Sequence, residues 1–232
     1  MVEIKGIEKF APKDFPGCIS STVFLGGCNF RCPFCHNSEL VLRPEILPTF
    51  PPDYFLSFLD SRKGWLEGIC ISGGEPLLHD DLETLLILIK DRDLLVKVDI
   101  NGSFPSRLED LIQKRLVDYV AMDVKAPLKR YQEVTRATVN EEDIVRSLEI
   151  IKNSGLEYVF RTTLVPGLIG QEDIKEICQM LDGANIFLLQ QFVPLNTLDS
   201  KYLQKKPYGR EEVQEIAKIA EPYFSEVRIE GV

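Results

Sequence analysis

The sequence predicts an α/β fold, a partial (β/α)6 TIM-like barrel that forms a single domain over residues 1–232. Apolar, β-branched runs alternate with longer amphipathic segments six times, as expected for parallel strands joined by crossover helices. The length and the hydrophobic content of 44% suit one core near the upper end of the single-domain range. A doubly wound open sheet has the same alternation, but no glycine-rich dinucleotide fingerprint follows the first strand.

The elements are predicted from short apolar runs bounded by turn residues and from the helical segments between them. Strands are expected at Ile19–Leu25, Gly68–Ser72, Leu95–Ile100, Tyr119–Val124, Tyr158–Val165 and Ile186–Phe192. Helices are expected at Pro52–Leu59, Asp81–Lys90, Arg107–Arg115, Glu141–Asn153, Gln171–Leu181 and Glu211–Tyr223. Asn140 is a good N-cap for the helix that follows it. Residues 44–52 indicate a proline-rich loop, and residues 227–229 a short final strand.

Charge and hydropathy exclude several classes of protein. The net charge is -9, and no run of Lys or Arg exceeds two residues, so we expect no nucleic acid partner. No apolar stretch reaches the roughly eighteen residues of a membrane span, and the first ten residues lack a signal region, so we expect a cytoplasmic protein without membrane contact. In such a compartment the six cysteines indicate metal or redox chemistry rather than disulfides.

Three of the cysteines form a tight cluster in the loop of residues 26–37. Cys28, Cys32 and Cys35 have the spacing C-x3-C-x2-C directly after the first predicted strand, where an α/β fold binds its ligands. Three thiolates so close together can hold one cuboidal iron-sulfur cluster. With no fourth cysteine nearby, one iron stays open for a substrate, as a catalytic zinc keeps an open position.

A structural zinc site is the alternative for this loop. It would use the three cysteines together with His36. Zinc sites usually take their ligands in two separated pairs, whereas His36 directly follows Cys35. The spacing therefore favours the iron-sulfur cluster.

The spacing of the cysteines, with the aromatic Phe34 before the last of them, resembles the signature of the radical S-adenosylmethionine superfamily. The resemblance implies a radical enzyme with two cofactors, a 4Fe-4S cluster held by Cys28, Cys32 and Cys35 and S-adenosylmethionine bound to the open iron. It also implies reductive cleavage of the sulfonium to a 5'-deoxyadenosyl radical.

The strand that ends at Ser72 leads into Gly73-Gly74-Glu75-Pro76, which resembles the GGEP motif of this superfamily. Glycines allow close backbone approach to a ligand, and Glu75 can accept a hydrogen bond from the ammonium group of the cofactor. The same residues in isolation are more often an ordinary turn. Their place after a strand, downstream of the cysteines, favours the cofactor contact.

The next two strands end in Asp99-Ile100-Asn101 and Asp123-Val124-Lys125. In isolation, Asn101 with the next glycine fits a turn, and Asp123 with Lys125 fits a solvated ion pair. The resemblance implies instead that Asn101, Asp123 and Lys125 contact the cofactor and that Asp99 and Asp123 bind a monovalent cation. Ile100 stands where many relatives have Thr, so any contact there must come from backbone oxygen.

The remaining polar and thiol side chains carry weaker predictions. Those at the last two predicted strands either line the adenine or substrate side or satisfy a polar barrel interior: Arg161, Thr163, Gln190 and Gln191. The other cysteines are expected to be core residues: Cys18, Cys70 and Cys178. His79 is expected to be an ordinary residue at the start of a helix.

Two flanking motifs narrow the resemblance to the activating enzymes of glycyl-radical enzymes. These are Asp14-Phe15-Pro16-Gly17 and Cys35-His36-Asn37, which resemble pyruvate formate-lyase activating enzyme and, more closely, the activating protein of anaerobic ribonucleoside-triphosphate reductase. The resemblance implies that the radical takes hydrogen from a glycine of that partner, with an electron donor such as a flavodoxin or ferredoxin. The alternatives are a radical enzyme acting on a small molecule, such as a deazapurine precursor, and a non-catalytic metal-binding module.

Overall fold

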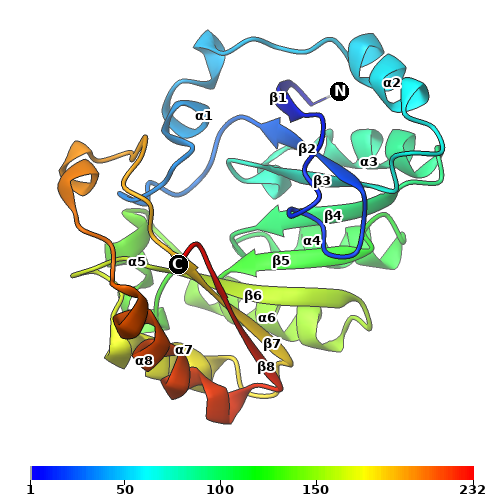
Figure 1. The fold of residues 1–232 in the computed structure, drawn as a ribbon. Coiled ribbons are helices and arrows are strands. Elements are labelled where there is room, and N and C mark those ends of the chain that lie inside the picture. The colour runs from blue at the N-terminus through cyan, green and yellow to red at the C-terminus, as the bar shows by residue number, and fades with distance from the viewer. Residues whose placement is uncertain (1) are drawn as a thin grey trace. The chain divides into compact units, whose positions relative to one another are not determined.

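The computed structural model describes residues 2–232 and contains every predicted strand and helix. The strands are β1 (Ile4–Glu8), β2 (Ser20–Leu25), β3 (Gly68–Gly73), β4 (Leu95–Ile100), β5 (Tyr119–Asp123), β6 (Glu157–Leu164), β7 (Ile186–Gln191) and β8 (Glu226–Glu230). The α-helices are α1 (Ser38–Leu42), α2 (Pro52–Ser61), α3 (Leu82–Lys90), α4 (Pro105–Gln113), α5 (Tyr131–Thr135), α6 (Glu141–Asn153), α7 (Gln171–Met180) and α8 (Arg210–Ala220). Figure 1 traces them in chain order.

The sheet order follows the sequence from β1 to β8. The α/β class with a mostly parallel sheet is therefore confirmed, and this order is compatible with a partial (β/α)6 barrel. Two strands lie outside the six predicted βα repeats. β1 was not predicted, and β8 extends the short strand expected at residues 227–229.

The chain divides into two compact units. The first comprises residues 1–29, 39–100 and 104–120, and the second comprises residues 30–38, 101–103 and 121–232. The cysteine loop contributes residues to both units, as β5 does. A single domain over residues 1–232 stays a prediction.

In the first unit, β1 pairs antiparallel with β2, while β2–β3 and β3–β4 are parallel. The register sets Ser20 opposite Gly68, and Gly68 opposite Leu95. Helix α3 packs on β4 and buries one apolar face. That face consists of Leu82, Leu85, Leu86 and Ile89. The first half of β2 is buried although it is polar, with Ser20, Ser21 and Thr22, whereas the interior of β3 is apolar up to Ile71.

In the second unit, β6–β7 and β7–β8 are parallel, and α8 packs on α7 and on these last two strands. Helix α6 begins as predicted, because the Asn140 side chain accepts a hydrogen bond from the Glu142 N–H at 3.2 Å. Within residues 2–232, no helix is long and apolar enough to cross a membrane.

Candidate active site

The start of the cysteine loop belongs to the first unit and is bound there through backbone atoms. The Gly27 N–H donates to the Leu40 carbonyl at 2.7 Å, and the Gly27 carbonyl accepts from the Glu75 N–H at 2.9 Å. The Gly74 N–H donates to the Leu25 carbonyl at 2.9 Å. The segment after β3 therefore lies directly against the backbone that leads to Cys28.

Gly73 and Gly74 are required by this contact. A Cβ on Gly74 would lie 1.7 Å from the Gly27 carbonyl oxygen, and one on Gly73 would lie 2.3 Å from that of Leu25. Gly73 also has a φ of +116°, which side chains rarely adopt. The glycines thus allow close approach of two protein backbones, and their contact with a cofactor stays a prediction.

Glu75 is 1% exposed, and its carboxylate is used locally. Its Oε1 accepts from the Leu77 N–H at 3.0 Å and so caps the short 3-10 turn Pro76–Leu78. This cap fixes the carboxylate immediately after the Gly73–Gly74 segment, where the sequence predicts the ammonium group of the cofactor.

The rest of the cysteine loop belongs to the second unit. The Cys35 N–H donates to the Cys32 carbonyl at 3.1 Å, which closes a tight turn around the buried Phe34. The Arg31 N–H donates to the Thr135 carbonyl of α5 at 2.8 Å, and the Leu198 N–H donates to the Cys35 carbonyl at 3.2 Å. Helix α5 and the segment after β7 therefore bind this part of the loop, and neither was predicted to do so.

His36 gives no support to the zinc alternative. Its Nε2 hydrogen-bonds the Val193 carbonyl at 2.6 Å. In the described residues, no group of three or more His, Cys, Asp or Glu side chains is arranged to hold one metal ion. A cuboidal cluster makes a different demand, because each thiolate binds its own iron at a separate corner.

The Asp123 carboxylate lies between two cations in the second unit. Arg161 Nε donates to its Oδ1 at 2.8 Å, and Lys125 Nζ lies 3.1 Å from its Oδ2. Burial favours the neutral acid, but Arg161 and Lys125 together hold the pKa of Asp123 well below its usual range. Burial likewise opposes the charge on Lys125, and Asp123 outweighs it, so the pKa of Lys125 is raised. All three groups are charged at neutral pH.

Tyr131 orients the backbone of this segment. It is fully buried, its hydroxyl accepts from the Lys125 N–H at 3.2 Å, and its ring packs edge-on to Phe30 at 6.3 Å between centroids. Burial raises the pKa of Tyr131, so the hydroxyl stays protonated. Lys125 is thereby placed close enough to Cys32 and Cys35 to interact with their charge.

Asp99 lies at the end of β4 in the first unit and is ion-paired to Lys97, which the sequence did not single out. It also accepts from the Ser72 hydroxyl at 3.1 Å. Asn101 is placed in the second unit, where its Oδ1 accepts from the Ser103 N–H at 3.0 Å. This is the side-chain turn considered above, and the cofactor role of Asn101 stays a prediction.

The weaker predictions have mixed outcomes. Arg161 forms an ion pair with Asp123. Gln191 Nε2 donates a hydrogen bond to the Tyr208 carbonyl at 2.6 Å, and Gln190 Nε2 donates one to the Glu230 carboxylate at 3.0 Å. None of the six cysteines is in a disulfide. Cys70 and Cys178 are buried, so their expected core positions are confirmed. The expectation is wrong for Cys18, which is half-buried in the loop before β2.

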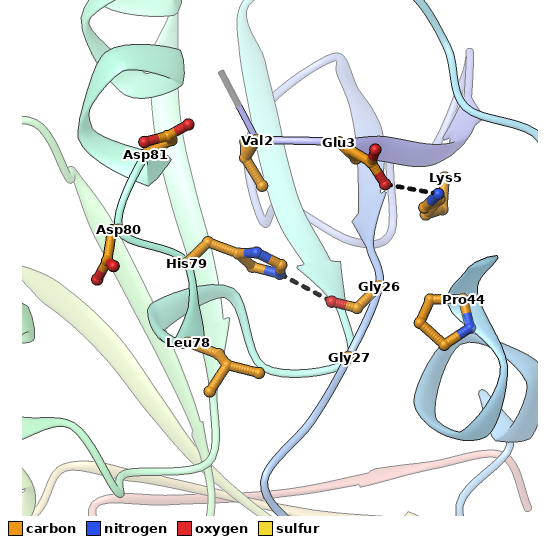
Figure 2. A pocket seen from close by; sticks show the side chains of 10 residues that line it. All are labelled: Val2, Glu3, Lys5, Gly26, Gly27, Pro44, Leu78, His79, Asp80 and Asp81. Atoms are coloured by element: carbon orange, nitrogen blue, oxygen red, sulfur yellow. Dashed lines mark hydrogen bonds and ion pairs between the residues drawn. The ribbon is translucent and has the colours of Figure 1, made fainter.

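His79 does more than begin a helix. Its Nε2–H donates to the Gly26 carbonyl at 2.8 Å, two residues before Cys28. Figure 2 shows this bond at the edge of a cavity of about 580 Å³, with Asp80 and Asp81 on the same rim. Neither Cys28 nor the Gly73–Glu75 segment lines this cavity. Gly26 and Gly27, at the start of the cysteine loop, do line it.

The donor set fits an iron-sulfur cluster. Cys28, Cys32 and Cys35 form no disulfide, and two of them interact with the charge of the Lys125 ammonium, which favours thiolate ligands. Burial raises the pKa of Cys35, but a bound metal deprotonates its thiol outright. Backbone hydrogen bonds hold the loop itself in place.

Comparison with known families matches residues 22–181 to the radical SAM superfamily. The chain belongs to this superfamily. The match begins within β2, ahead of the cysteine loop, and ends directly after α7. Membership implies a 4Fe-4S cluster and S-adenosylmethionine as cofactors, and it makes the chain a radical SAM oxidoreductase rather than a non-catalytic metal-binding module.

Sequence relatives place this radical SAM protein among the glycyl-radical enzyme activating enzymes. A protein of Methanocaldococcus jannaschii named as such an enzyme is 32% identical over 99% of this chain and 96% of its own length. The pyruvate formate-lyase-activating enzyme of Clostridium pasteurianum is 26% identical over 88% of this chain and 87% of its own. The narrower likeness to the ribonucleotide reductase branch stays a prediction.

Solved structures agree on the fold. Streptococcus suis SuiB superimposes with a TM-score of 0.67 at 16% identity, over 88% of this chain and 46% of SuiB. This chain therefore spans about half the length of SuiB. A domain of the pyruvate-formate lyase-activating enzyme from Bacteroides vulgatus has a TM-score of 0.58 at 19% identity, over 71% of this chain and 99% of that domain.

Proposed function

We propose that this radical SAM protein activates a glycyl-radical enzyme, which we identify as an anaerobic ribonucleotide reductase. When bound, the cluster would supply the one electron needed for reductive cleavage of S-adenosylmethionine to methionine and a 5'-deoxyadenosyl radical, which would take hydrogen from a partner glycine. The products are 5'-deoxyadenosine and a glycyl radical.

The observation that carries the proposal is the electrostatic interaction of the Lys125 ammonium with Cys32 and Cys35, in a chain whose relatives activate glycyl-radical enzymes. Lys125 is fixed by Asp123 and by the buried Tyr131 hydroxyl. A fixed positive charge beside two thiolates offsets the negative charge that they bring to a cluster. This is the electrostatic setting that a cluster site needs.

Residue roles follow from these positions. Cys28, Cys32 and Cys35 are proposed as the cluster ligands. The remaining predicted contacts with S-adenosylmethionine are proposed at the strand ends and in the cysteine loop: Phe34, Gly73, Gly74, Glu75, Asn101, Asp123 and Lys125. Glu75 would accept from the ammonium group of the cofactor through the carboxylate oxygen that does not cap the 3-10 turn.

The choice of partner rests on the flanking motifs. Two of their residues also have local roles: Asp14 accepts from the Thr22 hydroxyl, and Phe15 packs edge-on to Tyr119 at 5.8 Å. The proposal therefore depends on a direct test with candidate partners. The electron donor is proposed to be a flavodoxin or a ferredoxin, and the cytoplasmic location stays a prediction.

The test is formation of a glycyl radical in a named partner. Anaerobically reconstituted protein, reduced and supplied with S-adenosylmethionine, is incubated separately with the anaerobic ribonucleotide reductase and with any pyruvate formate-lyase of the same organism. A glycyl doublet by electron paramagnetic resonance in the reductase alone supports the proposal. A doublet only in the lyase moves the assignment to that partner, and turnover of a free deazapurine precursor without any doublet overturns it.

Replacing Cys32 by Ala removes one proposed anchor of the cluster. We expect loss of cluster iron and of S-adenosylmethionine cleavage, by at least about a hundredfold, because a missing first-shell ligand disables the site. The matched control is Cys178→Ala, since Cys178 is a buried thiol on α7. That control should keep its iron and lose only stability. Full cleavage by Cys32→Ala would show that the ligand assignment is wrong.

A further inference from the structure

Lys97 is a buried charge that the proposed reaction does not use. Its side chain is 3% exposed on β4, between the buried Val96 and Val98. Its ammonium is ion-paired to the Asp99 carboxylate, lies 3.5 Å from Cys70 Sγ and lies 6.0 Å from the centre of the Tyr119 ring. A charge is buried at this depth only when a partner of opposite charge compensates it.

Asp99 is the partner that compensates Lys97. Residues two apart on a strand face the same side of the sheet, so the side chains of Lys97 and Asp99 on β4 lie side by side. Asp99 also accepts from the hydroxyl of Ser72, which directly precedes Gly73. The pair thus lies next to the strand end where the cofactor is proposed to bind.

The second unit repeats this arrangement with different residues. Asp123 is bound by Arg161 Nε at 2.8 Å and by Lys125 Nζ at 3.1 Å. The family resemblance assigns a monovalent cation to Asp99 and Asp123. Both carboxylates are already ion-paired with Lys or Arg side chains of this chain. Ile100, next to Asp99, adds no side-chain oxygen. These residues do not fit a free cation.

We propose that Lys97 is the resident cation of Asp99 and takes the place of a bound alkali ion at the cofactor site. An alkali ion in contact with Asp99 would lie beside a buried ammonium, and repulsion between like charges disfavours its binding. The lysine supplies the same single positive charge without depending on the salt around the protein. The link to the cofactor site rests on the proposed function, whereas the ion pair does not.

The decisive experiment needs neither cluster nor cofactor. Thermal unfolding of the protein without iron is compared in potassium chloride, sodium chloride and choline chloride at equal ionic strength. We expect the wild-type Tm to be the same in all three, because Asp99 is already neutralised by Lys97. A saturable rise of the wild-type Tm in potassium or sodium chloride, absent in choline chloride, would overturn the proposal.

Lys97→Met keeps the apolar stem of the side chain and leaves Asp99 without its ammonium. We expect this variant to gain a preference for small cations, with a Tm about 2–4 °C higher in potassium or methylammonium chloride than in choline chloride. Lys90→Met is the matched control, since Lys90 pairs with Asp118 in a more exposed ion pair, with side chains 27% and 30% exposed. The Lys90→Met variant should show no cation preference. If the Lys97→Met variant also shows no cation preference, the proposal is contradicted.

A second variant protects the test against misfolding. In Lys97→Met/Asp99→Asn both charges are removed, so the double variant should fold and its Tm should not respond to cation identity. A cation response that persists in the double variant would place the ion elsewhere and overturn the proposal. A wild type that cleaves S-adenosylmethionine equally in potassium and choline chloride supports the inference. Absence of cleavage in every salt counts against the proposed function alone.

Discussion

Backbone hydrogen bonds hold both halves of the cysteine loop, but the surroundings of those bonds differ between the halves. Residues 26–29 lie in the first unit, where backbone hydrogen bonds hold them against the segment after β3. Gly74 has no side chain that would prevent this close contact. Residues 30–38 lie in the second unit, where backbone bonds from α5 and from residues 198–199 hold them, and the Asp123 ion pairs lie beside them.

This difference predicts how each half tolerates change. A close approach of two backbones has no room to adjust, so one added methyl group must displace the chain. A half-buried ion pair with two cations is adjustable, because the remaining partner compensates part of any loss. We therefore expect the first half to respond to side-chain volume and the second to charge.

The largest effect is expected for Gly74→Ala. The added Cβ would lie 1.7 Å from the Gly27 carbonyl oxygen, so the backbone before Cys28 must move, and we expect a loss of about 3 kcal/mol or more in the free energy of unfolding. Urea unfolding measures it. Gly170→Ala is the control, because the atom nearest to its Cβ is the Tyr208 hydroxyl at 3.6 Å, an ordinary contact. Equal losses in the two variants would contradict the comparison.

An intermediate effect is expected for Arg161→Met, which removes one of the two cations of Asp123 in the second unit. Breaking a buried ion pair costs about 3–5 kcal/mol, but Asp123 keeps Lys125 and its side chain is 25% exposed, so we expect about 2 kcal/mol. Arg228→Met removes an exposed pair with Glu226 and should have a clearly smaller effect than Arg161→Met. The same urea titration, run at pH 7, checks both.

The loss in Arg161→Met should depend on pH with a definite sign. The pKa of Asp123 is lowered from 3.8 in the folded protein, so its pairing stabilises the fold above that pH and is lost as the pH falls below it. The difference between wild type and Arg161→Met should be complete at pH 7 and shrink below about pH 4. A difference that stayed constant down to pH 3 would show that Arg161 acts by packing.

The fold was largely predictable because its strands are continuous apolar runs with clear ends. β4 and α6 have the predicted bounds, and the other predicted elements differ by one to three residues at their ends. β1 was missed because Ile4–Glu8 contains Gly6 and its two isoleucines are three positions apart, which breaks the alternation expected of a strand. Helix α5 was missed because its five residues are too few for a periodic pattern.

The part of the site that the spacing of the cysteines defines was predictable from the sequence. Ion pairs between side chains on different strands were less predictable, because they depend on how the sheet is assembled. Arg161 meets Asp123 only after strands β5 and β6 have formed, so no local pattern joins them. Lys97 did carry a signal. A lysine between Val96 and Val98 in a buried strand requires a counter-charge, and Asp99 is two residues away on the same face.

The smallest effect is expected for His79, the side chain that reaches the first half of the loop. His79→Ala removes the donor to the Gly26 carbonyl, and we expect a loss of about 1 kcal/mol in unfolding free energy, because the backbone bonds of Gly27 and Gly74 remain. His79→Gln retains an amide donor at a similar reach and should recover most of the loss. If His79→Ala costs as much as Gly74→Ala, the first half depends on a side chain as well, and the contrast between the two halves fails.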